Sequence, residues 1–225
     1  MVESSHHEKD EALAPAEMLA LVRDQQRSVE GQIAAFVPLL LVAWGVAWLF
    51  GLGALWLIDG MRPGLTVPPA VAITIAAALF VGAIVLSAVL GARSGRGVRR
   101  DAATAFPAIV YGCTWSLGTV AIVAVGLGLL ANGMDAALAR IFFPTVLVLF
   151  AGLMFVLGAA IWRAVPMLLL GVWIVAVAVA APFFGYPAVL LVLAVGGGLG
   201  FLALGALSFR HLSRLRRPLA GGRRG

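Results

Sequence analysis

The residues best suited to bind a molecule are aromatic or carry a hydroxyl, and they gather in two long apolar runs of the chain. Trp44 and Trp48 lie one helical turn apart in the first of these runs. An indole face attracts cations, so the pair could line a cavity for an aromatic or cationic ligand. Packing between helices explains the same spacing, and both interpretations remain open.

The third apolar run is the most polar of the set and holds the other candidate substrate-lining residues. Tyr111 and Trp115 form an aromatic ridge, and Ser116 and Thr119 add hydroxyl groups. Gly112 shares a face with Ser116 and Thr119, and such a stripe of small residues lets another helix approach closely. Helix packing, with the hydroxyls bonded to backbone carbonyls, is the alternative to a substrate site.

Groups able to catalyse a reaction are missing from the apolar runs. An ionisable residue at membrane depth is the usual mark of function, and none is present, which argues against a carboxylate-based proton antiporter. Metal sites need histidine or acidic ligands, but His6, His7 and His211 lie outside the runs. Ser87 and Ser116 have no base at that depth. We therefore expect no catalytic, cofactor-binding or metal-binding residue, and no enzyme activity.

The elements that position these residues follow from the distribution of charge. The mean hydropathy is +1.06 and 62% of residues are hydrophobic, above the roughly 45–50% of soluble proteins. Outside one arginine cluster, the segment between Gln32 and Phe209 has six charged residues, and all of them separate apolar runs: Asp59, Arg62, Asp101, Asp135, Arg140 and Arg163. At about 20 residues per helix, these runs predict a polytopic membrane protein with six spans.

The predicted fold is an all-α membrane helical bundle preceded by an amphipathic interfacial helix. We expect an acidic disordered tail at 1–14, the amphipathic cytoplasmic helix at 15–31, a transmembrane domain at 32–209 and a basic cytoplasmic tail at 210–225. The expected spans are about 33–58, 69–90, 105–130, 141–162, 167–181 and 188–208. Gly196 and Gly200 form a GxxxG pair that favours close packing, as Gly112 does in the third span. The three consecutive glycines at 196–198 also allow a flexible point.

Basic residues predict the orientation of the chain. With both termini cytoplasmic, the inner segments hold fourteen lysines and arginines and the outer loops hold only Arg62 and Arg140. The inner arginines are expected to contact anionic lipid or a soluble partner, and not nucleic acid; they include Arg93, Arg96, Arg99, Arg100, Arg214, Arg216 and Arg217. The strong excess of arginine over lysine suggests a GC-rich genome and a bacterial plasma membrane.

The layout resembles the membrane subunits of type-2 ATP-binding-cassette exporters. The matching features are the amphipathic helix at Pro15–Glu30, the six spans and the basic loop Arg93–Asp101, which in that family docks the ATPase. The turn Gly185-Tyr186-Pro187 departs from the family, whose members usually carry re-entrant helices there. The layout equally resembles small multi-span proteins of actinobacteria. The resemblance implies a separate cytoplasmic ATPase subunit.

Three functions follow from these observations. The first is the permease-like component of a transporter energised by another subunit. The second is an energy-independent facilitator or channel that uses the two aromatic surfaces. The third is a membrane scaffold or sensor that recruits soluble partners. Assembly with further copies of the same chain is compatible with all three.

Overall fold

The structure, a computed structural model, describes residues 36–94 and 102–221. Its described residues form helices, turns and loops, with no strand among them. Within these two ranges, six helices are long and apolar enough to cross a membrane: Phe36–Trp56, Pro69–Arg93, Ala105–Ala131, Ala136–Trp162, Val165–Phe184 and Ala188–Arg210. The prediction of an all-helical membrane protein with six spans is therefore confirmed. The predicted tail at 1–14 and amphipathic helix at 15–31 lie outside the described residues, as do Arg96, Arg99 and Arg100.

Two of the spans contain a π-helical turn. Span 1, Phe36–Trp56, passes through the π-helical turn η1 (Ala47–Leu52) and ends as α2 (Gly53–Trp56). Span 6, Ala188–Arg210, contains α7 (Ala188–Val192), the π-helical turn η3 (Leu193–Gly197) and the start of α8. The other helices are α3 (Pro69–Ser94), α4 (Ala102–Ala131), α5 (Ala136–Trp162), α6 (Val165–Ala180), the short 3₁₀-helix η2 (Ala181–Phe184) and α8 (Gly198–Gly221).

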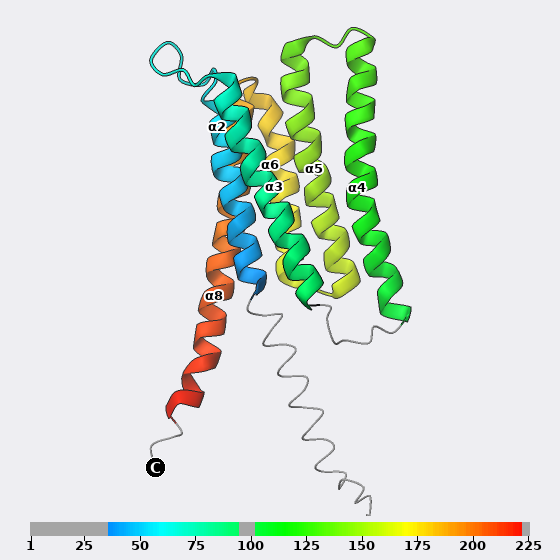
Figure 1. Ribbon diagram of the computed structural model, residues 1–225, viewed down its shortest axis with the longest axis vertical. Coiled ribbons are helices and arrows are strands. Elements are labelled where there is room, and N and C mark those ends of the chain that lie inside the picture. Colours follow the sequence, from blue (N-terminus) through cyan, green and yellow to red (C-terminus); the bar gives the residue numbers. More distant parts are fainter. Residues whose placement is uncertain (1–35, 95–101, 222–225) are drawn as a thin grey trace, which may run out of the picture.

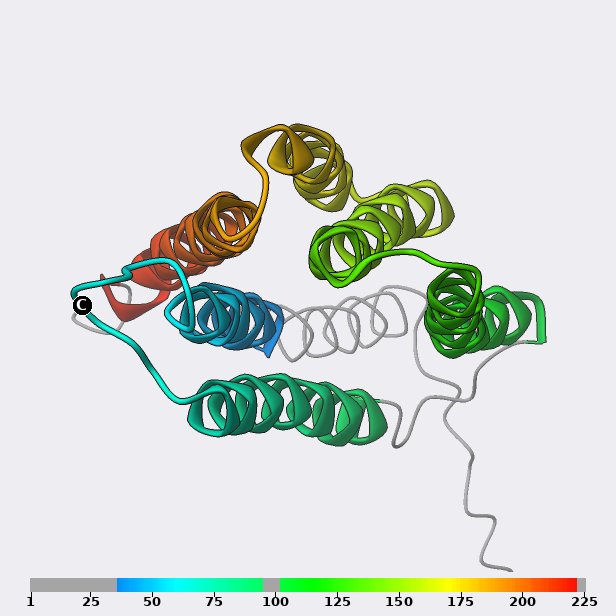
Figure 2. The same ribbon diagram turned by 90° about the horizontal axis from the view of Figure 1, so that it is seen from above.

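The described spans form an open arc, as Figure 2 shows from above. Neighbours along the arc are α3, span 1, span 6, α6, α5 and α4, in an order that the helix contacts support. Among the described helices, α3 and α4 are the two ends of the arc. They are also the least buried, with 11% and 6% of their most apolar segments inside the protein, against 44% in span 6.

Glycines set the closest contacts between helices. A Cβ atom added to Gly171 on α6 would lie 2.7 Å from the backbone nitrogen of Val156 on α5, and 2.9 Å from the carbonyl oxygen of Gly152. Gly45 of span 1 and Gly198 of span 6 approach in the same way, each with a Cβ position 3.1 Å from the other's carbonyl oxygen. Small residues let membrane helices pack at such short distances.

The three glycines that the sequence assigned to packing have different surroundings. In span 6, Gly196 faces Val177 and Gly200 faces Trp173, both on α6. Gly112 makes no such contact with the described residues, because a Cβ atom there would meet nothing within 4 Å. Two glycines of α4 approach α5: the Cβ position of Gly118 is 2.3 Å from the Phe150 ring, and that of Gly126 is 2.4 Å from the Phe143 ring. Hydropathy does not distinguish these faces, since a lipid-facing and a helix-facing surface are equally apolar.

Different loops and turns form the two ends of the bundle (Figure 1). The upper end in that view carries the loops at 57–68 and 132–135 and the turn at 185–187, and the lower end carries the turn between Trp162 and Val165. The helix α8 continues past the span to Gly221 and protrudes from the lower end. Arg214, Arg216 and Arg217 are thus part of a helix that extends beyond the bundle.

Candidate functional site

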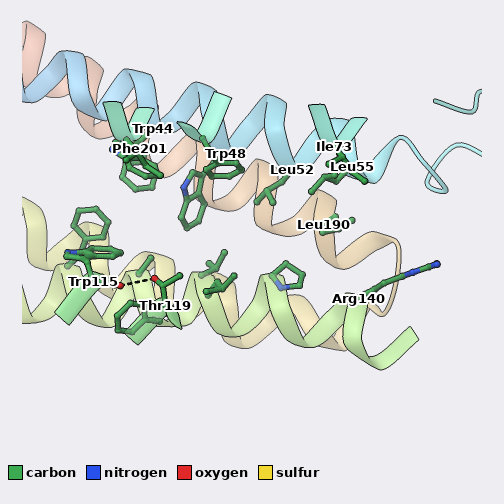
Figure 3. Close-up of a pocket in the computed structure, with 18 of the residues that line it drawn as sticks. Trp44, Trp48, Leu52, Leu55, Ile73, Trp115, Thr119, Arg140, Leu190 and Phe201 are labelled. Atoms are coloured by element: carbon green, nitrogen blue, oxygen red, sulfur yellow. Dashed lines mark hydrogen bonds between the residues drawn. The ribbon is translucent and has the colours of Figure 1, made fainter. Parts of the chain in front are cut away.

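The concave side of the arc encloses a cavity of about 1260 Å³, larger than the roughly 300–1,000 Å³ of common ligand sites. Span 1, α3, α4, α5 and span 6 all contribute to its wall (Figure 3). The lining residues are mainly aliphatic and aromatic: Trp44, Trp48, Leu52, Leu55, Ile58, Asp59, Pro69, Ile73, Phe80, Ile84, Ser87, Tyr111, Trp115, Ser116, Thr119, Val120, Arg140, Pro144, Leu147, Val148, Phe150, Ala151, Phe155, Tyr186, Leu190 and Phe201.

The cavity is long in the direction of the helices. On α3 its lining extends from Pro69 to Ser87, which is about 27 Å at roughly 1.5 Å per residue. On α5 it extends from Arg140 to Phe155, about 22 Å by the same rise. The hydrocarbon core of a bilayer is about 30 Å thick. The cavity therefore follows most of the depth that an apolar molecule occupies in a membrane.

The wall formed by spans 1 and 6 contains closely packed aromatic rings. Trp48 is 5% exposed, and its indole meets the Phe201 ring edge-on with centroids 5.3 Å apart. The same indole covers Gly197, where a Cβ atom would lie 2.3 Å from the ring. Trp44 lies beside Phe80 at 6.4 Å. These contacts fix the two tryptophans as rigid parts of the wall.

A hydrogen bond joins this wall to the second span. The indole nitrogen Nε1 of Trp44 donates to the hydroxyl of Ser87 over 3.0 Å, and that hydroxyl donates in turn to the Ala83 carbonyl over 2.8 Å. Both polar groups are thereby satisfied inside an apolar environment, where an unpaired donor is costly. Ser87 therefore links α3 to span 1 through a hydrogen bond.

The opposite wall is centred on Trp115 of α4. Its indole lies edge-on to Phe150 at 5.6 Å, to Phe155 at 6.1 Å and to Tyr111 at 6.2 Å. The Tyr111 hydroxyl donates to the Met154 carbonyl over 3.2 Å, which links α4 to α5. Edge-to-face pairs of this kind stabilise the arrangement beyond simple burial.

All six residues that the sequence indicated as substrate-lining border this one cavity. They come from two spans that do not neighbour each other in the arc: Trp44, Trp48, Tyr111, Trp115, Ser116 and Thr119. Ser116 and Thr119, which were expected to pack on a helix together with Gly112, therefore border the cavity, and Gly112 does not. The Thr119 hydroxyl donates to the Trp115 carbonyl over 2.8 Å, so it is already paired. Contact of these residues with a substrate stays a prediction.

Sequence reasoning missed the charged group at the upper end of the cavity. The Tyr186 hydroxyl donates to Oδ2 of Asp59 over 2.6 Å. Arg62 pairs with the same carboxylate, Nη2 to Oδ1 at 3.1 Å, and Nη1 of Arg140 lies 3.7 Å from Oδ2. The Arg140 guanidinium also covers the Tyr186 ring, 5.1 Å from its centroid.

Burial raises the pKa of the Tyr186 hydroxyl above its ordinary value, and the hydrogen bond to Asp59 raises it further. This tyrosine therefore stays protonated and keeps its role as donor. The only sequence signal for the cluster was charge, since Asp59, Arg62 and Arg140 were all expected in loops on one side of the membrane. Nothing in the sequence paired Asp59 with Tyr186, which is 127 positions away.

Among the described residues, no group of three or more histidine, cysteine or acidic side chains could hold a metal ion. The chain matches no protein-family model, and no curated protein or solved structure resembles it significantly.

Proposed function

We propose that this integral membrane protein is the membrane-spanning component of a transporter for lipophilic molecules, which it holds in the cavity inside the arc of helices. The observation that carries the proposal is the cavity itself, about 1260 Å³ in volume and lined mainly by apolar and aromatic side chains. An apolar molecule in the bilayer meets a compatible surface there over most of the membrane depth.

The chemistry of the wall indicates what the cavity can select. Moving an apolar molecule from lipid tails into an apolar cavity gains little from the hydrophobic effect, because both environments are apolar. Selectivity must then come from shape and from contacts with the rings of Trp44, Trp48 and Trp115. Ile73 and Ile84 on α3 also line the cavity, and they are 56% and 54% exposed. This exposure supports access from the side of α3.

Directional transport needs a source of energy, and the layout of the chain supports a separate ATPase subunit as that source. Arg93, exposed at the lower end of α3, begins the basic loop expected to contact such a partner. An energy-independent facilitator would use the same cavity. Flux of a lipophilic probe through the lone protein in liposomes would favour the facilitator, and a stoichiometric ATPase that co-purifies from the native membrane would favour the energised transporter.

A pair of matched variants on α4 tests the use of the cavity. Thr119 lines it, whereas Leu117 lies outside the lining and is 72% exposed. Thr119→Trp should place a large ring inside the cavity, obstruct the path of a long apolar chain, and reduce retention of co-purified lipid or binding of a fluorescent lipophile at least several-fold. Leu117→Trp adds a large ring to the same helix and should leave binding unchanged.

Native mass spectrometry of the protein in mild detergent, together with a fluorescence titration, measures both effects. Equal binding by the wild type and the two variants would contradict the proposal, because it would place the bound molecule outside the cavity.

A further inference from the structure

The charged side chains of the cavity wall lie at one end. Asp59, Arg140 and Tyr186 border the cavity at its upper end, as Figure 3 shows for Arg140, while Trp115 lies toward the other end. Between them the wall is formed by residues such as Leu52 and Leu190. A long apolar body with a charged group at one end is the complement of an amphiphile.

The charges of this cluster do not cancel, although the upper end as a whole also carries Asp135, whose side chain caps α5. One carboxylate, Asp59, faces two guanidinium groups, Arg62 and Arg140, which leaves a formal charge of +1. The carboxylate is already engaged by the Tyr186 hydroxyl at 2.6 Å and by Arg62 at 3.1 Å. Arg140 is 3.7 Å from it, well beyond the roughly 2.7–2.9 Å of a charge-assisted hydrogen bond. Arg140 is the weakly paired member of the cluster.

The position of Arg140 suits the capture of an anion. Its side chain is 58% exposed, and the Tyr186 ring beneath the guanidinium restrains the planar group through a cation–π contact. A guanidinium presents several N–H donors in a fork that matches carboxylate and phosphate oxygens. Donors not taken up by Asp59 can therefore turn to a ligand without loss of the Tyr186–Asp59 bond.

We propose that the ligand of the cavity is an anionic amphiphile, whose apolar chain lies along the cavity and whose carboxylate or phosphate head group binds Arg140. This inference rests on the proposed function and names the substrate class of the same site. A lipid chain occupies about half of the 30 Å hydrocarbon core, so it fits within the length of the cavity. Arg140 exchanges its long contact with Asp59 for a short bidentate contact with the head group.

Three probes with the same chain and different head groups test the assignment: hexadecanoate, hexadecanol and hexadecylamine. At about pH 9 the acid is ionised and the amine is still protonated. Their affinities for the purified protein are measured by displacement of a fluorescent lipophile. We expect hexadecanoate to bind about tenfold more tightly than hexadecanol, as one charged hydrogen-bonded contact predicts, and hexadecylamine to bind most weakly.

Variants then assign the preference to one side chain. Arg140→Gln should bring the ratio between hexadecanoate and hexadecanol to about one. Arg62→Gln removes an equal charge from a residue that does not line the cavity, and it should keep most of the preference. A preference that survives in Arg140→Gln would overturn the assignment.

The wild-type series is informative even if Arg140→Gln does not fold. Equal binding of the three probes, or tightest binding of hexadecylamine, would overturn the head-group assignment and leave the cavity proposal standing, provided that Thr119→Trp still blocks binding. Absence of binding by all three probes would overturn both.

Discussion

Replacing Gly171 with alanine tests the contact between α5 and α6 that holds one half of the arc together. The added Cβ atom would lie 2.7 Å from the Val156 nitrogen and 2.9 Å from both the Gly152 oxygen and a Val156 methyl carbon. Comfortable separations between carbon atoms are about 3.5–4.0 Å. Two of the three neighbours are backbone atoms, which cannot rotate away, so the helices themselves must separate by several tenths of an ångström.

The expected cost follows from two opposing effects. Overpacking of a tight core typically costs about 1–3 kcal/mol. Alanine recovers up to about 1 kcal/mol relative to glycine through its better helix propensity. Because the nearest neighbours are backbone atoms, we expect the overpacking cost to be about 2–3 kcal/mol, in the upper part of that range. The free energy of unfolding of Gly171→Ala should therefore fall by about 1–2 kcal/mol, which for a chain of this size corresponds to a decrease of roughly 2–8 °C in the melting temperature.

Gly112→Ala is the matched control, because the same atom added there meets nothing within 4 Å. It should leave the melting temperature unchanged or raise it slightly. Both variants are compared with the wild type in mild detergent, by intrinsic tryptophan fluorescence during heating and by size-exclusion chromatography after heating. Equal melting temperatures for Gly171→Ala and Gly112→Ala would refute the close approach of α5 and α6.

Two further predictions concern single hydrogen bonds. Ser87→Ala removes the acceptor of the Trp44 indole and should lower the free energy of unfolding by about 0.6–1.7 kcal/mol, from the average to the largest value for side-chain hydrogen bonds between membrane helices. Thr74→Ala on the same helix removes only a hydrogen bond to its own helical turn, so it should have little effect on the melting temperature. The pKa of Tyr186 is raised in the folded protein. Its hydrogen bond to Asp59 therefore contributes its full stabilisation below the ordinary tyrosine pKa of about 10, and this stabilisation is lost as the pH rises through the raised pKa. The difference in melting temperature between the wild type and Tyr186→Phe should be constant from about pH 6 to 9 and shrink above pH 10; a difference that shrinks already below pH 9 would contradict this.

The number of helices could be predicted because charge and length alone determine it in a membrane protein. Their ends were less predictable. The fourth span was expected to begin after Arg140, but α5 begins at Ala136, because the Asp135 side chain accepts a hydrogen bond from the Leu138 nitrogen over 2.7 Å and caps the helix. Arg140 therefore lies within the helix and is held at a fixed place beside the cavity.

Part of the cavity lining was predictable from the sequence, but its geometry was not. Tyrosine, tryptophan and hydroxyl side chains are unusual enough in apolar runs to mark Tyr111, Trp115 and Thr119. Which way they face depends on the rotation of α4, and lipid-facing and helix-facing surfaces are equally apolar. The contact of Asp59 with Tyr186 depends on how distant loops meet at the upper end, and no periodicity within one span encodes it.

The π-helical turn η1 explains how span 1 supplies a continuous wall to the cavity. Trp44, Trp48 and Leu52 recur every four residues. In a regular α-helix of 3.6 residues per turn, this spacing drifts by about 40° at each step, so Leu52 would point about 80° away from Trp44. The wider turn of η1, which spans Ala47–Leu52, offsets that drift.

The facing turn η3 supplies the space that this arrangement needs. It ends at Gly197, against which the Trp48 indole packs, and the next residue, Gly198, meets the backbone of Gly45. A side chain larger than hydrogen at Gly197 would push Trp48 toward the cavity and narrow it. The run of glycines in span 6 thus has a specific role: it accommodates the aromatic wall of span 1, and π-helical turns on both sides of the contact are typical of helices shaped around a binding site.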